Sequence, residues 1–245
     1  MRLTIACKDY GDHLARTLPL WCQLVSHECS ITVVTSKEDT ETFAIARARY
    51  VRTYITDAWT RHDPTYTRDV SHWRSFWQRK GIDMRQPTLN KALALDEAFG
   101  FVPSFTPPPA DGEVCVVADA DCRPVGKLPD ERAIKDGVLY GCKRYELLAD
   151  GSKGPLMPIR GRATLQRTQH AKNWFVCQGY FQMFRWHEGM RFGSYPAADA
   201  YDDDFAHTFS KGEEVKDFYV LHQGGMETTH TNWRGRVTPR FEASA

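Results

Sequence analysis

The sequence has no long apolar run and almost no net charge. Its 245 residues include 32 Lys and Arg and 31 Asp and Glu, for a formal net charge of +1. This balance argues against electrostatic attraction of the whole protein to nucleic acid or membrane surfaces. No apolar stretch approaches the roughly 20 residues that span a bilayer. The N-terminal MRLTIACKDY also lacks the apolar core and cleavage site of a signal peptide, so we expect no membrane span.

The seven cysteines form no CxxC pair and no cluster with histidine. This scatter argues against a disulfide framework or a zinc site and favours reduced thiols in a cytoplasmic setting. Cys7, Cys115, Cys142 and Cys177 lie within expected strands, where cysteine behaves as a small hydrophobe, so we expect them in the core. Only one glycine follows the first expected strand, in ACKDYGDH, which argues against the Gly-rich phosphate loop of a nucleotidyltransferase.

What the first half does contain is an alternation of short β-branched runs with apolar residues at helical spacing. We expect strands over residues 3–9, 30–36, 50–58 and 113–121. We expect helices over residues 11–27, 37–50 and 87–101. This order predicts a single α/β domain with a mainly parallel central sheet and helices on both faces.

Two carboxylates, Asp119 and Asp121, end the apolar run of the fourth expected strand. Ligands of open parallel sheets bind at the carboxyl ends of strands, and closely spaced carboxylates suit Mg²⁺ or Mn²⁺ with substrate phosphates as further ligands. The alternative is a solvated, Asp-rich turn with no ligand. By itself this spacing does not decide between the two.

Four segments together resemble the GT-A-fold glycosyltransferases. VVADADCRP looks like their metal-binding DxD segment, and TLNKALALDEAF is similar to the helix that precedes it in β-1,4-galactosyltransferases and their bacterial relatives. YDDDFAHTF resembles their acceptor-side acidic motif, and VLHQGG the late strand that ends in a metal-binding histidine. The resemblance implies a GT-A-like, Rossmann-like domain over 1–245. Its nucleotide-sugar-binding half would be 1–125, its acceptor-side half 126–225 and its flexible tail 226–245.

The resemblance also implies a metal centre. Asp119, Asp121 and His222 would hold Mn²⁺ (or Mg²⁺) against the diphosphate of a nucleotide-sugar, with Asp121 as the most direct ligand and UDP as the expected nucleotide. Lys91 takes the place of a family arginine near the diphosphate; an ordinary exposed helix lysine is an equal alternative. For His222 the alternative is a histidine with a satisfied hydrogen bond and no ligand role.

The acidic run after Tyr201 supplies the expected catalytic base. The resemblance places Asp202 at the base of an inverting transfer, with Asp203 as the near rival, and three adjacent carboxylates should raise at least one pKa toward a useful range. The alternative is a solvated, helix-capping turn. Tyr201 stands where the family usually has an acceptor-binding glutamate, so the acceptor is not fixed as an ordinary sugar.

Donor-binding residues are expected at the ends of the first two strands and in the strand GYFQMFRW. At the ends of the first two strands the expected residues are Lys8, Asp9, Thr35 and Ser36. All four are also ordinary turn formers. Gly179 and Tyr180 are expected to line the sugar pocket, although a half-buried core strand fits the alternation there as well.

Two segments, 59–87 and 143–174, mix basic and aromatic residues. They suit a lid over the donor, an acceptor platform, a nucleic-acid contact or a simple extension of the core. Three functions follow: a metal-dependent inverting glycosyltransferase with a hydroxyl acceptor, transfer to hydroxylated bases of DNA, and a nonenzymatic nucleotide- or glycan-binding domain. The sequence does not indicate the oligomeric state.

Overall fold

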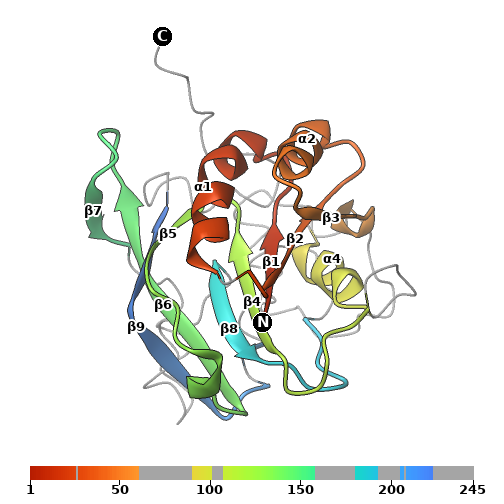
Figure 1. The fold of residues 1–245 in the computed structure, drawn as a ribbon, viewed down its shortest axis with the longest axis vertical. Coiled ribbons are helices and arrows are strands. Elements are labelled where there is room, and N and C mark those ends of the chain that lie inside the picture. Colours follow the sequence, from red (N-terminus) through yellow and green to blue (C-terminus); the bar gives the residue numbers. More distant parts are fainter. Residues whose placement is uncertain are drawn as a thin grey trace, which may run out of the picture.

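The fold of the chain is seen in a computed structural model, which describes residues 1–25, 27–60, 90–100, 107–157, 180–192, 205–206 and 208–222. A nine-stranded sheet runs through the molecule (Figure 1) in the order β3-β2-β1-β4-β8-β6-β9-β5, with β7 paired to β6. None of the helices in these ranges is long and apolar enough to cross a membrane.

The first half of the sheet is parallel, as predicted. β1 pairs with β2 and with β4, and β2 pairs with β3, all in parallel. These strands are β1 (Arg2–Ala6), β2 (Ser30–Thr35), β3 (Arg52–Ile55) and β4 (Val114–Asp119). The helices of this half are α1 (Gly11–Leu24), α2 (Thr40–Ala48) and α4 (Lys91–Ala98), with a 3₁₀ turn η1 (Ala58–Thr60) after β3. Each of these strands and α-helices overlaps the range expected from periodicity, whereas the turn η1 was not predicted.

The second half of the sheet is mixed. β8 pairs antiparallel with β4 and β6, β9 runs parallel to β6, and β5 runs antiparallel to β9. The strands are β5 (Cys122–Gly126), β6 (Val138–Leu147), β7 (Lys153–Leu156), β8 (Phe181–Arg185) and β9 (Lys211–His222), with a 3₁₀ turn η2 (Glu131–Ala133) before β6. These pairings extend the parallel half without a break, because β4 and β8 are direct neighbours.

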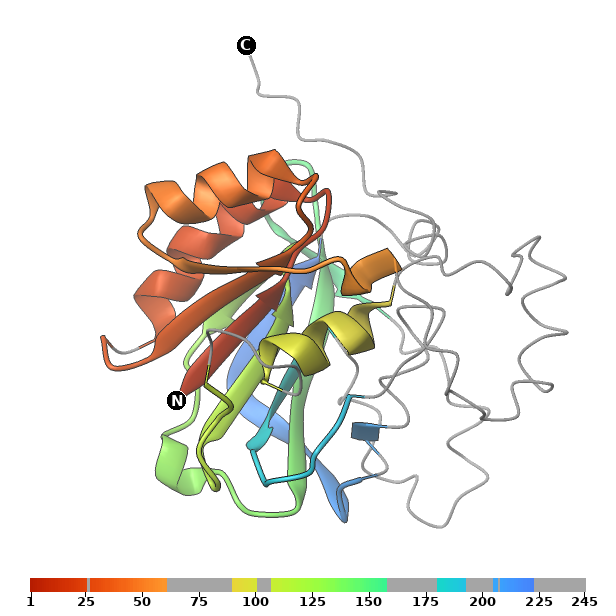
Figure 2. The ribbon, with the colours of Figure 1, turned by 90° about the vertical axis from the view of Figure 1, so that its right-hand side faces the viewer.

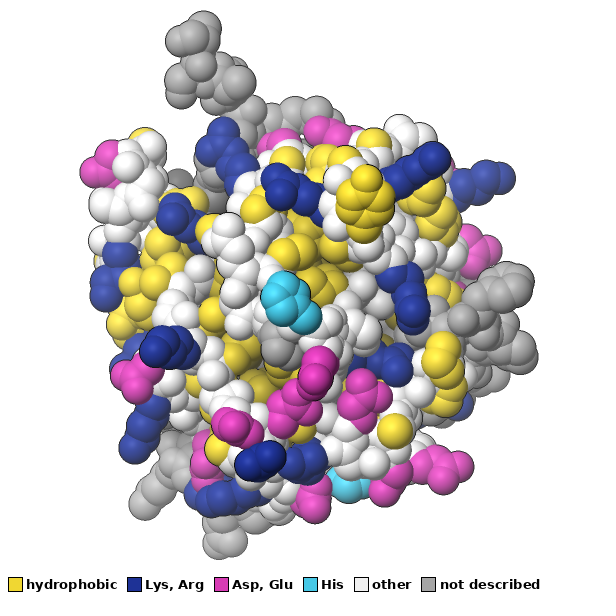
Figure 3. All heavy atoms as spheres, viewed as in Figure 1, with side chains coloured by type: hydrophobic (Ala, Val, Ile, Leu, Met, Phe, Trp, Pro, Cys, Tyr) yellow, Lys and Arg dark blue, Asp and Glu magenta, His cyan; other side chains and the backbone are white. Residues whose placement is uncertain are grey.

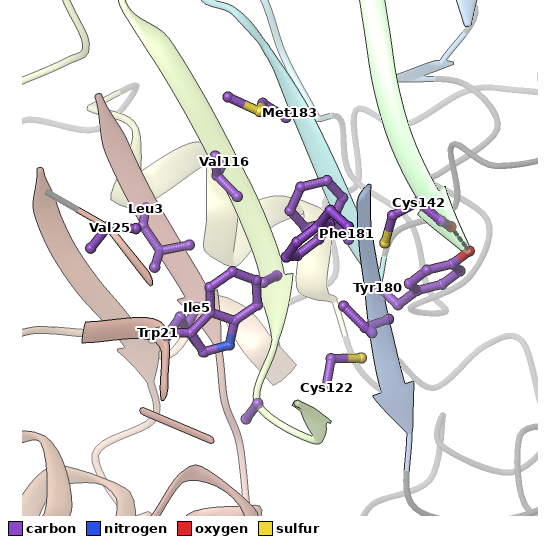
Figure 4. Close-up of a cluster of buried hydrophobic side chains, with 14 of the residues drawn as sticks. Leu3, Ile5, Trp21, Val25, Val116, Cys122, Cys142, Tyr180, Phe181 and Met183 are labelled. Carbon is purple, nitrogen blue, oxygen red and sulfur yellow. Dashed lines mark hydrogen bonds between the residues drawn. The ribbon is translucent and has the colours of Figure 1, made fainter. Parts of the chain in front are cut away.

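Helices cover both faces of the sheet, and each face has its own core. Figure 2 shows α1 and α2 on one side of β1 and β2, and α4 on the other. On the α1 face Leu3, Ile5 and Val116 pack around Trp21, which stacks on Phe181 with ring centroids 6.3 Å apart (Figure 4). The α4 face is built from the alternate strand positions and the apolar side of α4, namely Ala6, Val34, Cys115, Val117, Leu95 and Phe99.

This alternation is what a central strand covered on both faces requires, since successive side chains point to opposite sides. The fold-class prediction, an α/β domain with helices on both faces, is therefore confirmed. The expectation that Cys7, Cys115 and Cys142 are core residues is confirmed as well, since all three are buried. Cys177 lies outside the described residues, and the division of the chain at residues 125 and 225 stays a prediction.

Candidate metal and donor site

The carboxyl ends of β1, β2 and β4 meet at one edge of the sheet. The Cys7 N–H, just past β1, donates to the carbonyl of Val34 in β2 at 2.9 Å. The Ala120 N–H, just past β4, donates to the carbonyl of Ala6 at the end of β1 at 3.1 Å. Loops that are far apart in the sequence are thus joined here by backbone hydrogen bonds. This edge is where ligands bind in open sheets of parallel strands.

The turn of Asp119, Ala120 and Asp121 is held at this edge by two further contacts. The Asp119 N–H donates to the carbonyl of Tyr180 at 3.2 Å, and the hydroxyl of Thr17 in α1 donates to the carbonyl of Ala120 at 2.7 Å. Asp121 is only 8% exposed. The alternative of a solvated Asp-rich turn is therefore wrong for Asp121, and its carboxylate needs a buried partner.

That partner is His222, the last residue of β9. Antiparallel pairing of β5 and β9 places Cys122 opposite His222, and so brings the preceding Asp121 close to the imidazole. His222 Nε2 lies 3.1 Å from Asp121 Oδ2, and His222 is 3% exposed. Two ligands of one octahedral ion, each about 2.1 Å from it, lie about 3 Å apart. The pair therefore has the spacing that a shared divalent ion requires, although a plain hydrogen bond has it too.

Asp119 has a different partner. Its Oδ1 accepts from Nζ of Lys91, at the start of α4, in a close ion pair. Lys91 is 6% exposed, so the alternative of an exposed helix lysine is wrong. Asn90 caps α4 by accepting from the Leu93 N–H at 3.1 Å, which fixes the helix end that carries Lys91.

Charge compensation sets the two carboxylates apart. Burial raises the pKa of Asp121, but the charge and hydrogen bond of His222, with smaller contributions from His13 and Arg144, outweigh it and hold the pKa below its ordinary value. Burial raises the pKa of Asp119; the Lys91 ammonium opposes this shift and the Asp121 charge adds to it. Asp121 is therefore the carboxylate of the two that is held more firmly in its ionised form.

Within the ranges that the structure describes, no three His, Cys, Asp or Glu side chains are grouped so that they could hold a metal ion. Asp121 and His222 are close enough to share one, while Asp119 is turned to Lys91. Divalent magnesium-like ions are commonly bound by one or two carboxylates, with waters and substrate phosphates completing the shell. The residues present therefore fit a divalent ion that is completed by the substrate. The assignment of Asp119, Asp121 and His222 as its ligands stays a prediction.

The expected donor residues differ in burial. Thr35 and Ser36 are buried, whereas Lys8 is partly exposed and forms an ion pair with exposed Asp9, with Nζ and Oδ2 3.2 Å apart. The Thr35 hydroxyl is engaged with another side chain, since it donates to Asp39 Oδ2 at 3.0 Å. Lys8 and Asp9 therefore lie at the surface of this edge, and the donor-binding role of all four residues stays a prediction.

Asp39 is the residue that sequence reasoning missed. Its carboxylate, 5% exposed, accepts from the Asp9 N–H at 2.7 Å and from the Thr42 N–H at 3.1 Å, in addition to the Thr35 hydroxyl. It is the N-cap of α2 and also fixes the loop after β1. An aspartate followed by a helical pattern is typical of a helix N-cap, so the start of α2 could be predicted from the sequence. The hydrogen bond to the loop that carries Asp9 could not.

Two more side chains lie near this turn, one from β6 and one from the residue just before β8. Tyr180 is buried, and its hydroxyl donates to the carbonyl of Cys142 at 2.7 Å. The guanidinium carbon of Arg144 lies 4.6 Å from the centroid of the Tyr180 ring, within cation–π distance. Tyr180 was expected to line the sugar pocket, whereas Arg144 was expected only as part of the basic segment 143–174.

Comparisons with known proteins find similarity only among solved structures. No family model and no curated protein matches the chain. A galactosyltransferase, LgtC, in complex with donor and acceptor sugar analogues is similar over 76% of this chain, with 12% identity and a TM-score of 0.38. TarS from S. aureus is similar over 90%, with 11% identity and a TM-score of 0.45. The mannosyltransferase PcManGT from Pyrobaculum calidifontis, in complex with GDP-Man and Mn²⁺, is similar over 95%, with 13% identity and a TM-score of 0.43.

This chain spans 58%, 60% and 58% of the length of those three solved chains, respectively. Two of the three are named as sugar transferases.

Several predicted site residues lie outside the described residues. These are Asp202, Asp203 and Gly179, together with most of the two basic-aromatic segments. The catalytic base and the lid or platform roles therefore stay predictions.

On the face shown in Figure 3, basic and acidic side chains both occur across the surface, in line with the near-zero net charge.

Proposed function

We propose that this protein is a metal-dependent glycosyltransferase that moves a sugar from a nucleotide-sugar, expected to be UDP-linked, to a hydroxyl acceptor. The observation that supports it is the buried contact of 3.1 Å between Asp121 and His222 at the carboxyl edge of the sheet. These two residues come from strands about a hundred positions apart in the sequence, and both belong to motifs that resemble metal ligands of the GT-A glycosyltransferases. A turn with no ligand does not need an aspartate and a histidine buried together in this place.

In this proposal Asp121 and His222 hold Mn²⁺ or Mg²⁺, with Asp119 beside them. The ion, when bound, would neutralise the charge that develops on the leaving nucleoside diphosphate. Lys91 keeps the Asp119 carboxylate oriented at the end of β4 and adds positive charge to the site. Burial of the centre excludes water and so strengthens each of these electrostatic interactions.

The transfer itself would proceed with inversion. The acceptor oxygen bonds to the anomeric carbon as the bond from that carbon to the diphosphate oxygen breaks, and a carboxylate takes the acceptor proton. Asp202 is the proposed base and Asp203 its rival, on the strength of the motif resemblance alone. If the product keeps the anomeric configuration of the donor, as read by proton NMR of the glycoside, the inverting assignment is wrong.

Donor hydrolysis tests the proposal without knowledge of the acceptor. Release of nucleoside diphosphate from a panel of UDP- and GDP-sugars is measured with and without Mn²⁺ for wild type, Asp121→Asn and His222→Ala. We expect metal-dependent release that falls at least about 100-fold in both variants, the usual loss when a group that stabilises developing charge is removed.

The matched control is Asp150→Asn, which neutralises an exposed carboxylate in the turn between β6 and β7 and should leave release unchanged. Release that does not depend on metal, or that survives both substitutions, contradicts the proposed centre. If wild type neither hydrolyses a donor nor binds a nucleotide with Mn²⁺, the nonenzymatic alternative replaces this proposal.

A further inference from the structure

Arg144, in β6, is a positively charged residue that forms no ion pair with any side chain the structure describes. Across the described part of the chain its buried Nε also has no hydrogen-bond partner. Its contact is with the ring face of Tyr180, at 4.6 Å. A half-buried guanidinium without a carboxylate is costly unless something else satisfies it, because burial removes the water that solvates the charge.

The strand register places Arg144 beside the proposed metal centre. Parallel pairing of β6 with β9 puts Arg144 opposite Val220 and Glu146 opposite His222. Since residues two apart in a strand share a face, Arg144 and His222 lie on the same face of adjacent strands. The Tyr180 that Arg144 covers also accepts the Asp119 N–H through its carbonyl. Arg144 therefore adjoins both His222 and the Asp119 turn.

The pairing of the charges near Arg144 indicates what kind of group it binds. Asp119 is compensated by Lys91, and Asp121 lies against His222. The Arg144 charge also helps to hold the pKa of Asp121 low, which agrees with its proximity to the centre. A nucleoside diphosphate carries more negative charge than one divalent ion cancels, so a second cation beside the ion would stabilise it. A guanidinium binds phosphate oxygens through two parallel N–H bonds, which an ammonium cannot do.

We propose that Arg144 binds the diphosphate of the nucleotide-sugar donor, and that stacking on Tyr180 holds its guanidinium in position for this. The inference rests on the proposed function and adds one ligand residue to it. The stacking leaves the N–H groups at the edge of the guanidinium plane, while the ring covers only its face. Tyr180 is itself fixed, because its hydroxyl is bonded to the Cys142 carbonyl.

Calorimetry that compares the binding of a nucleoside diphosphate with that of the nucleoside tests whether Arg144 contacts the phosphates or only supports the fold. UDP and GDP, and then uridine and guanosine, are titrated in Mn²⁺ into wild type, Arg144→Met and Arg144→Lys. Arg144→Met should weaken binding of the preferred diphosphate about 10- to 100-fold, the usual range for losing a charged hydrogen-bond donor, and leave nucleoside binding unchanged. Arg144→Lys should recover only part of the loss, because it restores the charge but not the paired donors.

Lys143→Met is the matched control. It removes one positive charge from the next residue of the same strand, whose side chain points to the opposite face and is paired with Glu214 at 3.1 Å. It should bind diphosphate as wild type does. Equal diphosphate affinity of Arg144→Met and wild type, or an equal loss for nucleoside and diphosphate, overturns the inference while the proposed function stands. If wild type binds neither diphosphate with Mn²⁺, the proposed function fails and this inference fails with it.

Discussion

Removing the Asp39 carboxylate should loosen the edge of the sheet where the donor is expected. Asp39→Ala deletes three hydrogen bonds at once: those from the Asp9 N–H, the Thr35 hydroxyl and the Thr42 N–H. These donors belong to the loop after β1, the end of β2 and the first turn of α2. No other side chain bonds all three within the described residues, so the effect should be both a loss of stability and a loss of donor binding.

The loss in free energy of unfolding depends on whether each hydrogen-bond donor finds another acceptor once the carboxylate is gone. Loss of the N-cap bond to Thr42 costs about 1 kcal/mol. The Thr35 hydroxyl is 0% exposed and becomes an unsatisfied buried group, at about 1–3 kcal/mol. The Asp9 N–H belongs to an exposed residue and can bind water, so it adds little. The total is about 3 kcal/mol, which lowers the melting temperature of a domain this size by about 6–12 °C.

Urea unfolding followed by tryptophan fluorescence measures the free energy of unfolding. Nucleotide titration in Mn²⁺ measures the affinity for the donor nucleotide. Glu38→Ala is the control, since it removes the exposed carboxylate next in sequence and should change neither quantity. Asp39→Asn keeps one acceptor oxygen and should lose about half as much stability, because the new NH₂ group cannot accept from the donors that it faces. If Asp39→Ala loses less than about 1 kcal/mol, no more than the control, the three bonds do not act as described.

Two further predictions concern regions away from the donor edge. Arg185 donates to the carbonyls of Gly112, Glu131 and Ile134 at 2.6, 2.8 and 2.7 Å. Arg185→Lys keeps the charge but loses two of these three bonds, so it should lower the free energy of unfolding in urea by about 3 kcal/mol. A change near zero would contradict this. In a Cys177→Ala background, DTNB at pH 8 should label exposed Cys22 faster than Cys29. Burial raises the pKa of both thiols, but the pKa of Cys29 rises to about 11 and its side chain is less accessible. The remaining thiols should react only on unfolding, and early labelling of any of them would refute their burial. The remaining thiols are Cys7, Cys115, Cys122 and Cys142.

The elements of the first half were predictable because local patterns determine them. Leu14, Leu18 and Trp21 recur at helical spacing, and all three are buried against the sheet. The strand-helix alternation then favours parallel pairing, because each helix returns the chain to the same edge of the sheet. From this it followed that Asp119 and Asp121 lie at the carboxyl edge of the parallel strands. The structure agrees on this position, because the turn of these two residues is joined to the end of β1.

The partners across the second half were not predictable, because they depend on register between distant strands. Nothing local to residues 114–126 shows that Cys122 faces His222, or that Arg144 lies two positions from the residue opposite that histidine. A one-residue slip in either pairing would move these side chains to the other face. The motif resemblance predicted His222 as a ligand, but it gave no reason to examine Arg144 or Asp39.

The two aspartates at the end of β4 were expected to be tolerated together because one cation would bind both. The structure shows a different arrangement, in which each carboxylate has its own cationic or hydrogen-bonding partner: Lys91 for Asp119 and His222 for Asp121. Both negative charges at this edge are therefore compensated by side chains of the protein, which is why one buried and one partly buried carboxylate do not disrupt the fold. An ion that bridged both aspartates would compete with Lys91, whereas one held by Asp121 and His222 alone would leave that ion pair intact. Lys91→Met separates the two cases, because it should tighten Mn²⁺ binding if the lysine competes and leave the affinity unchanged if it does not.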